Sequence, residues 1–278
     1  MYNLLSTDFA RLWKNKSFWS CFIAGILICL VTVFGDYHSL ELYQEPKPLD
    51  EVFFCNVPLM GLISAIFVSL FLGADFSNGT IRNKISAGYK RVQIYLSGWM
   101  VCISGILMIL TAAMGVTVVM GIPLFGMFER TIGKILLLTA ACFLVIAAFT
   151  SLFVMVVMVI QERAVCAVAC LVLFLLMTVF SSLLESRLQE DKTAYDYVAV
   201  NEYGVPTQIE EKQNPRYIGG VRRQVLLVLH NVNLTGQTSQ ISNLDFLTAP
   251  PEMMFCSTGV LLFTTGTGIL IFKRKDMK

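Results

Sequence analysis

Long apolar stretches alternate with short polar ones along most of this chain. Several stretches of about 18 or more residues lack Asp, Glu, Lys and Arg, so each is long enough to cross a bilayer as an α-helix. They cover 17–35, 52–74, 92–128, 135–161, 164–184 and 253–272. The third is too long to lie wholly in a membrane, and we expect its helix to end near Pro123 and Gly126.

The fold class follows from these stretches. Only helices and closed barrels satisfy backbone polar groups in lipid, and the stretches lack the alternation of barrel strands. Composition agrees, because 56% of the 278 residues are hydrophobic and 14% are charged, whereas soluble domains carry about 25% charged residues. The sequence predicts an all-α, polytopic membrane helical bundle with six transmembrane helices.

The first apolar stretch also has features of a signal peptide, because Arg11, Lys14 and Lys16 precede it. No small-residue cleavage site follows it, and five further apolar stretches do. We therefore expect an uncleaved first transmembrane helix.

Basic residues gather on one side of the predicted spans. On the other side, the polar segment 36–51 has one basic residue, Lys47, among five acidic ones: Asp36, Glu41, Glu45, Asp50 and Glu51. Because Lys and Arg are enriched in cytoplasmic segments, both termini are expected in the cytoplasm. The basic residues on that side are Arg11, Lys14, Lys16, Arg82, Lys84, Lys90, Arg91, Lys273, Arg274, Lys275 and Lys278.

The expected organisation has four parts. Residues 1–16 form an amphipathic elbow helix, with Leu5, Phe9, Leu12 and Trp13 on its apolar stripe and Asp8, Arg11 and Lys14 off it. This helix is either an anchor or also a contact for a cytosolic partner. Residues 17–185 hold the first five transmembrane helices, 186–251 an extracellular loop region, and 252–278 the sixth transmembrane helix with a basic tail.

Within the extracellular region, the apolar piece 225–234 is too short to span a membrane and is expected to form an amphipathic or buried helix at the outer mouth. Pro250 and Pro251 are expected to begin the last transmembrane helix. That helix is rich in Gly, Ser and Thr. Close helix packing is favoured over a substrate path as the reason.

Signals of catalysis are missing from the sequence. It has no Walker A motif, HExxH motif or nucleophile elbow, and no ionisable residue deep in a predicted span. The eight cysteines form no CxxC pair, and the two histidines lie far apart. We expect no catalytic residue, no metal site, no directly bound cofactor and no nucleic-acid partner.

In the first half of the chain, the segment 75–91 is strongly polar and basic and lies between two long apolar runs. Ile81, Ile85 and Tyr89 form an apolar stripe at intervals of four, with Arg82 and Lys84 off it. Asp75 or Ser77 is expected to cap a helix here, and Gly88 to let the chain turn back. A plain positive loop is the alternative to a helix with a face for docking a partner.

This segment resembles the permease subunits of ABC type-2 exporters, in which an acidic–aromatic step ends the second span and a small-polar Gly-Thr-Ile-Arg-Asn-Lys run follows. The resemblance extends to the six spans, the elbow and the basic tail. A stretch from Asn214 to Gln237 resembles the outer loop of permeases common in Gram-positive bacteria. The matching residues are Asp75, Phe76, Asn78, Gly79, Thr80, Ile81, Arg82, Asn83, Lys84, Gly88, Tyr89, Lys90 and Arg91.

The resemblance implies a mechanism. A coupling helix from about Asp75 to Tyr89 would dock in a groove of a separate ABC ATPase subunit, and Glu162 with Arg163 would be a second, shorter contact. Two ATPase subunits carrying ATP and Mg²⁺ would serve a homodimer, or a heterodimer with a sister permease, in the bacterial plasma membrane. The large outer region sets this chain apart from smaller family members.

Three functions are compatible with the sequence. The first is an exporter permease that moves a hydrophobic or peptide-like compound such as an antibiotic or peptide. The second is a membrane sensor or scaffold that docks a cytosolic partner without transporting. The third, a membrane-embedded enzyme, ranks last because the sequence offers no catalytic cluster.

Overall fold

The computed structural model describes residues 1–44, 47–200 and 206–275, and is helical apart from one β-hairpin. Glu45 and Lys278 lie outside the described residues. By length and composition, six of its helical segments can cross a membrane, which confirms the predicted fold class and implies a surrounding bilayer. These segments are α2 (Lys16–Tyr43), α3 with α4 (Leu49–Ser77), α6 (Arg91–Phe125), α7 (Ile132–Ile160), α8 (Arg163–Leu188) and α11 (Pro250–Arg274).

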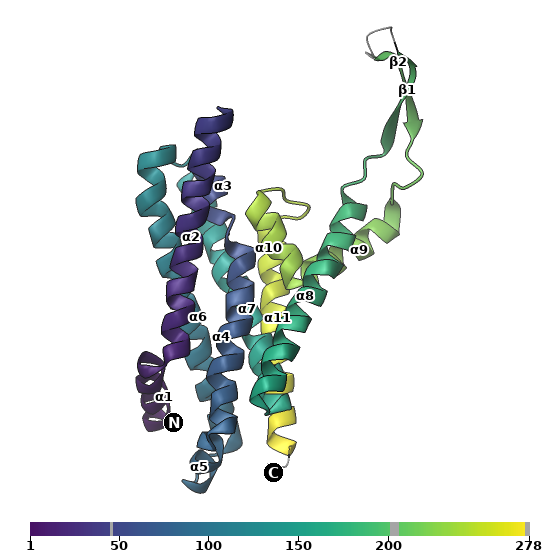
Figure 1. Cartoon of the computed structure of the whole chain (residues 1–278). Helices are drawn as coiled ribbons and strands as arrows, with labels where there is room; N and C mark the ends of the chain where they lie inside the picture. The colour runs from purple at the N-terminus through teal and green to yellow at the C-terminus, as the bar shows by residue number, and fades with distance from the viewer. Residues whose placement is uncertain (45–46, 201–205, 276–278) are drawn as a thin grey trace.

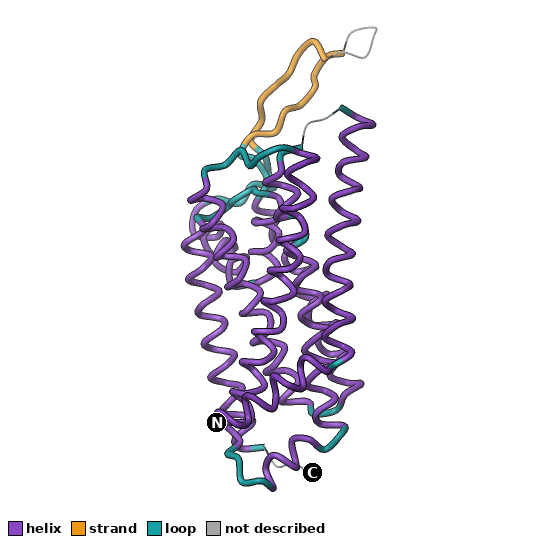
Figure 2. The backbone as a smooth tube through the Cα atoms, turned by 90° about the vertical axis from the view of Figure 1, so that its left-hand side faces the viewer, coloured by secondary structure: helices purple, strands orange, loops and turns teal. Residues whose placement is uncertain are grey.

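The helices run side by side, and both chain termini lie at one end of the bundle (Figure 1). We call this the terminal end. It also carries the short helix α5 (Thr80–Ser86). At the opposite end, which we call the hairpin end, strands β1 (Thr193–Val200) and β2 (Pro206–Gln213) pair antiparallel and project beyond the helices (Figure 2).

One predicted helix boundary needs correction and another is confirmed. The second apolar stretch is broken into α3 (Leu49–Phe54) and α4 (Val57–Ser77). The break is explained by Pro58, which lacks an N–H and whose ring would clash with the carbonyl of Phe54. The third long helix, α6, ends at Phe125, and Gly126 follows as its C-cap with φ of 87°. The helix therefore ends near Pro123 and Gly126 as predicted, with Pro123 inside its last turn.

Small residues bring the helices together, as predicted. α11 packs along α7, where the Ser151 hydroxyl lies 2.9 Å from that of Thr264 and 2.8 Å from that of Thr265. Gly61 lets α4 approach the rings of Phe149 and Phe174 on α7 and α8. Close packing of transmembrane helices depends on such small side chains.

Apolar side chains remain exposed on one side of α2 and on much of α8 and α11. Ile23, Leu27 and Val31 recur at intervals of four on α2, each at least half exposed. Exposed residues of this kind are expected where lipid or another transmembrane helix covers the protein.

The region predicted as an extracellular loop contains the β-hairpin and two helices, and it partly enters the bundle. After the β-hairpin come α9 (Gly220–Val232) and α10 (Leu234–Asn243). At their junction, Asn233 Nδ2 donates to the Met177 carbonyl of α8 at 2.8 Å, and Thr235 Oγ1 donates to the same carbonyl at 2.7 Å. Met177 lies eleven residues before the end of α8, which corresponds to about 16 Å along the helix axis.

α10 is polar yet mostly buried, and it packs against α4, α7 and α8. Its side chains are satisfied internally, because Gln240 Nε2 lies 3.1 Å from His230 Nδ1 and Gln237 accepts from Ser257 at 2.5 Å. Buried polar groups persist in proteins when they are hydrogen-bonded in this way. Of the two alternatives predicted for 225–234, an amphipathic or a buried helix, α9 is the amphipathic one. The buried element is the next helix, α10.

Gly268 is a position where α11 cannot accept a side chain. A Cβ atom there would overlap the buried hydroxyl of Tyr95 on α6, whereas a Cβ at Gly266 would meet nothing within 4 Å. We expect Gly268→Ala to lower the free energy of unfolding by about 1–3 kcal/mol through overpacking. Gly266→Ala is the matched control and should leave thermal unfolding in detergent unchanged. Equal melting temperatures for the two variants would contradict the packing of α11 on α6.

His230 makes stability depend on pH. The imidazole is buried, and burial lowers the pKa of His230 below its ordinary value of 6.5. The unfolded chain therefore binds a proton that the folded chain does not, so stability is present above about pH 6.5 and is lost as pH falls below it.

We expect the melting temperature to fall between about pH 7.5 and pH 5.5, and His230→Gln to weaken this dependence, because glutamine keeps hydrogen-bonding capacity without titrating. The exposed His38 provides the control His38→Gln. Parallel melting curves for the wild type and His230→Gln across this range would show that His230 is not the titrating group.

Candidate docking site at the terminal end

The segment 75–91 is not one helix. Asp75 lies in the last turns of α4, a turn follows at Asn78 and Gly79, and α5 is only seven residues long. Gly79 is the N-cap of α5, with φ of 69°, so the predicted capping by Asp75 or Ser77 is wrong. The left-handed backbone at Gly79 separates the two helices, because residues with a Cβ rarely adopt it. Gly88, with φ of 89°, makes the predicted turn back to the membrane.

One side of this segment packs on the bundle. Ile81 is 2% exposed, and Ile85 and Tyr89 are half-buried against the hydrophobic core, as the predicted stripe requires. Phe76 also packs on the core. The segment is thus seated on the bundle by apolar contacts.

The opposite side of the segment is exposed. We call it the α5 polar face, and it comprises Asn78, Arg82, Asn83, Ser86 and Lys90. Of the other predicted docking residues, Gly88 is exposed, Gly79, Thr80 and Arg91 are half-buried, and Asp75 is buried. A compact surface with amide, hydroxyl and cationic groups can hydrogen-bond a partner without burying much apolar area.

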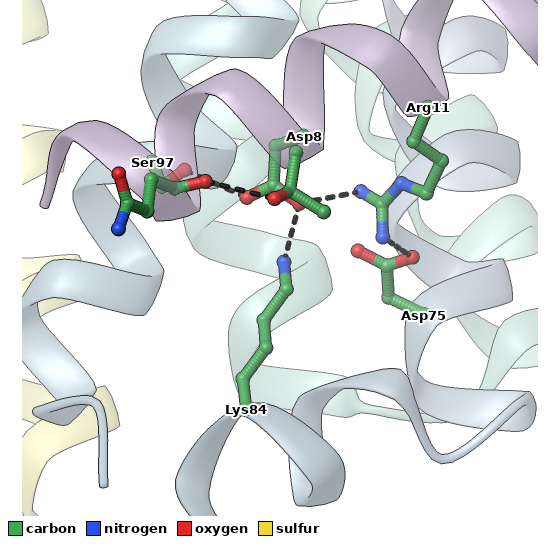
Figure 3. Close-up of polar contacts among 7 residues, drawn as sticks. Asp8, Arg11, Asp75, Lys84 and Ser97 are labelled. Carbon is green, nitrogen blue, oxygen red and sulfur yellow. Dashed lines mark hydrogen bonds and ion pairs between the residues drawn. The ribbon is translucent and has the colours of Figure 1, made fainter. Parts of the chain in front are cut away.

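Lys84 does not belong to this exposed face. Its Nζ lies 2.7 Å from Asp8 Oδ1, and Ser97 Oγ donates to Asp8 Oδ2 at 2.6 Å. Arg11 pairs with Asp75 and also lies 3.7 Å from Asp8. Figure 3 shows Asp8 between Lys84, Arg11 and Ser97, with Asp75 reached through Arg11. We call Asp8, Arg11, Asp75, Lys84 and Ser97 the charge network.

The charge network joins four helices. Asp8 and Arg11 come from α1 (Tyr2–Lys14), Asp75 from α4, Lys84 from α5 and Ser97 from α6. The Asp8 and Asp75 side chains are 1% and 6% exposed and that of Lys84 is 11% exposed. Two carboxylates balance two cations, which burial requires, because an unpaired charge away from water is very costly. Arg11 also lies 4.7 Å above the ring of Phe71, a cation–π contact.

The prediction for the elbow helix missed the role of Asp8. α1 exists as predicted, but Leu4, Asp8 and Leu12 form its buried side. The spacing of four residues was visible in the sequence, yet polarity placed Asp8 off the apolar stripe. Ser97 gave no signal at all, since a lone serine in an apolar run is usual.

Arg91 and the chain end form a second link at the terminal end. Arg91 donates to the carbonyls of Lys273, at 3.4 Å, and Lys275, while Lys275 donates to the carbonyl of Val159 near the end of α7. Cations at helix C-termini satisfy free carbonyls and oppose the helix dipole. Arg91 therefore has an internal partner as well as its predicted docking role.

The predicted second contact, Glu162 and Arg163, lies at the turn between α7 and α8. Both residues are exposed, and Gln161 before them has φ of 67°. Gly73 of α4 packs against Arg163, because a Cβ there would lie 3.3 Å from the Arg163 Cα. The turn is thus attached to the same helix that leads into the charge network.

Metal binding has no support at this end or elsewhere in the described ranges. No group of three or more His, Cys, Asp or Glu side chains is gathered in residues 1–44, 47–200 and 206–275.

Asp8→Asn tests the charge network. It should lower the free energy of unfolding by roughly 3–5 kcal/mol, because Lys84 would keep a buried charge without its carboxylate. Asp36→Asn is the control, since the Asp36–Lys47 pair at the hairpin end is 23% and 35% exposed and should contribute about 0–1 kcal/mol. Chemical or thermal unfolding in detergent measures both. Similar losses for the two variants would contradict a buried, stabilising network.

Comparison with known proteins assigns this chain to no family. No model of a known protein family matches this chain, and no curated protein sequence matches it either. The structure establishes a polytopic membrane protein with six candidate transmembrane segments.

Proposed function

We propose that this protein is the membrane-spanning permease subunit of an ATP-binding-cassette exporter, driven by a separate ATPase subunit. The supporting observation is the α5 polar face, an exposed polar surface held on the bundle by the charge network. The sequence resemblance of 75–91 to ABC type-2 permeases points to the same function. The chain itself would bind no cofactor, and ATP with Mg²⁺ would lie on two partner ATPase subunits.

The contacts provide a route for force. A partner pressing on α5 acts directly on α1 through Lys84 and Asp8, and on α4 through the short turn at Gly79. Ser97 extends the connection to α6. Because the paired charges cannot separate without exposing buried charge, these helices are expected to move as a unit. ATP-driven closure of the ATPases would tilt the bundle in this way.

A second permease subunit, identical or a sister chain, is part of the proposal. The exposed apolar stripes of α2, α8 and α11 offer surface for it within the bilayer. With the termini in the cytoplasm of a bacterial cell, the α5 polar face would meet the ATPases and the β-hairpin would face outward. The cargo would be hydrophobic or peptide-like.

The alternative is a membrane sensor or scaffold that docks a cytosolic partner without transporting. The projecting β1–β2 hairpin favours it, because such an extension suits recognition outside the membrane (Figure 1). The two functions differ in whether the docked partner hydrolyses ATP.

The docking surface is tested by reversing its charge. We expect Arg82→Glu with Asn83→Glu to abolish co-purification of an ABC ATPase subunit from native membranes in mild detergent. Gly79 is kept, since its positive φ would make a substitution distort the backbone as well. Arg187→Glu at the hairpin end, also exposed, is the matched control and should retain the ATPase.

The wild type should bring down an ATPase in stoichiometric amount, identified by mass spectrometry, and unchanged recovery with the double variant would refute docking at α5. A stoichiometric partner without nucleotide hydrolysis, such as a sensor kinase domain without an ATPase, would favour the scaffold function.

A further inference from the structure

A groove lies between α4, α8 and α10 toward the hairpin end. It encloses about 240 Å³, close to the lower end of ligand-binding pockets, roughly 300 Å³. Pro58, Leu59 and Phe174 line it with apolar surface, and hydroxyl side chains of α8 and α10 line the rest. One charged residue, Glu185, is among its lining residues. The groove thus pairs an apolar wall with a polar one.

The polar wall is rich in hydrogen-bond acceptors. Thr178 donates its proton to the carbonyl of Phe174 at 2.9 Å, and Thr238 donates to that of Thr235 at 2.9 Å. Ser239 donates to the Gly236 carbonyl and Thr235 to the Met177 carbonyl. A hydroxyl has a single proton, so these four side chains present only lone pairs to a ligand. Ser181, whose hydroxyl lies 3.4 Å from His230 Nε2, and Ser182 complete the wall.

Glu185 strengthens this preference. It lies in the last turns of α8 and is half-buried. Within the described part of the chain, its carboxylate has neither a hydrogen-bond nor an ion-pair partner. An ionised carboxylate only accepts hydrogen bonds, and one that is partly removed from water gains most from a cation with several donors.

We propose that this groove binds the ammonium group of an amphipathic primary amine. The ammonium donates to the Glu185 carboxylate and to the hydroxyl oxygens, and the alkyl portion lies against Pro58, Leu59 and Phe174. An alcohol has too few donors for this wall, and a carboxylate is repelled by it. The site goes beyond the proposed export function and does not depend on it, because binding is a property of this chain alone.

The test uses hexylamine as the probe. The purified chain is placed in nanodiscs of phosphatidylcholine, which has no primary amine, and hexylamine binding is measured by isothermal titration calorimetry at about pH 7.5, where the amine is protonated. We expect saturable binding of hexylamine and at least about tenfold weaker binding of hexanol, since a charge-assisted hydrogen bond is lost. Glu185→Gln should weaken hexylamine binding by a similar factor.

Two further variants complete the test. Thr178→Val removes one acceptor with little change of shape and should weaken hexylamine binding, which keeps the site testable if Glu185→Gln fails to fold. Glu252→Gln, an exposed carboxylate in the first turn of α11, should bind hexylamine like the wild type. Equal affinities for hexylamine and hexanol, or wild-type affinity in both Glu185→Gln and Thr178→Val, would overturn the proposal.

The source of the amine is decided by lipid composition. Replacing part of the phosphatidylcholine with phosphatidylethanolamine should weaken hexylamine binding if the groove holds the headgroup of an aminolipid. Unchanged binding assigns the site to a water-soluble amphipathic amine. If the docking experiment at α5 failed, the results of the amine-binding experiments would still hold, because no ATPase takes part in them.

Discussion

The buried pairing of Asp8 with Lys84 is the constraint on which the terminal end depends. Each charge is stable away from water only while the other is beside it, and each comes from a different helix. Arg11 and Asp75 repeat the arrangement between α1 and α4. The elbow helix is therefore an integral part of the bundle, and the same pair attaches α5 to α1.

Apolar length alone predicted the membrane helices, because a bilayer demands long uncharged segments and little else in the sequence imitates them. The stripe of Ile81, Ile85 and Tyr89 was equally readable, since it follows a local period. The break at Gly79 was not predicted, because glycine is compatible with either a helix or a left-handed turn and only the surrounding packing selects one.

The pairing within the charge network and the burial of α10 could not be predicted from the sequence, for a different reason. Asp8 and Lys84 are 76 positions apart, so their pairing depends on how α1 and α5 meet in space. α10 has the composition of a surface segment, and its burial is possible only because Gln237, Gln240 and their neighbours find partners on other elements. Sequence rules that treat polarity as a sign of exposure therefore fail for polar residues whose partners lie far away along the chain.

The link between Arg91, Lys275 and Val159 has a consequence for how the chain assembles. Lys275 follows Val159 by 116 positions, and Arg91 by 184. During synthesis, the ends of α6 and α7 are therefore made long before the residues that form hydrogen bonds with them. α11, which packs along α7, is the last long helix of the described chain to be produced. The terminal end reaches this arrangement only when α11 arrives, so the packing of α11 along α7 and the completion of the hydrogen bonds at this end coincide in time.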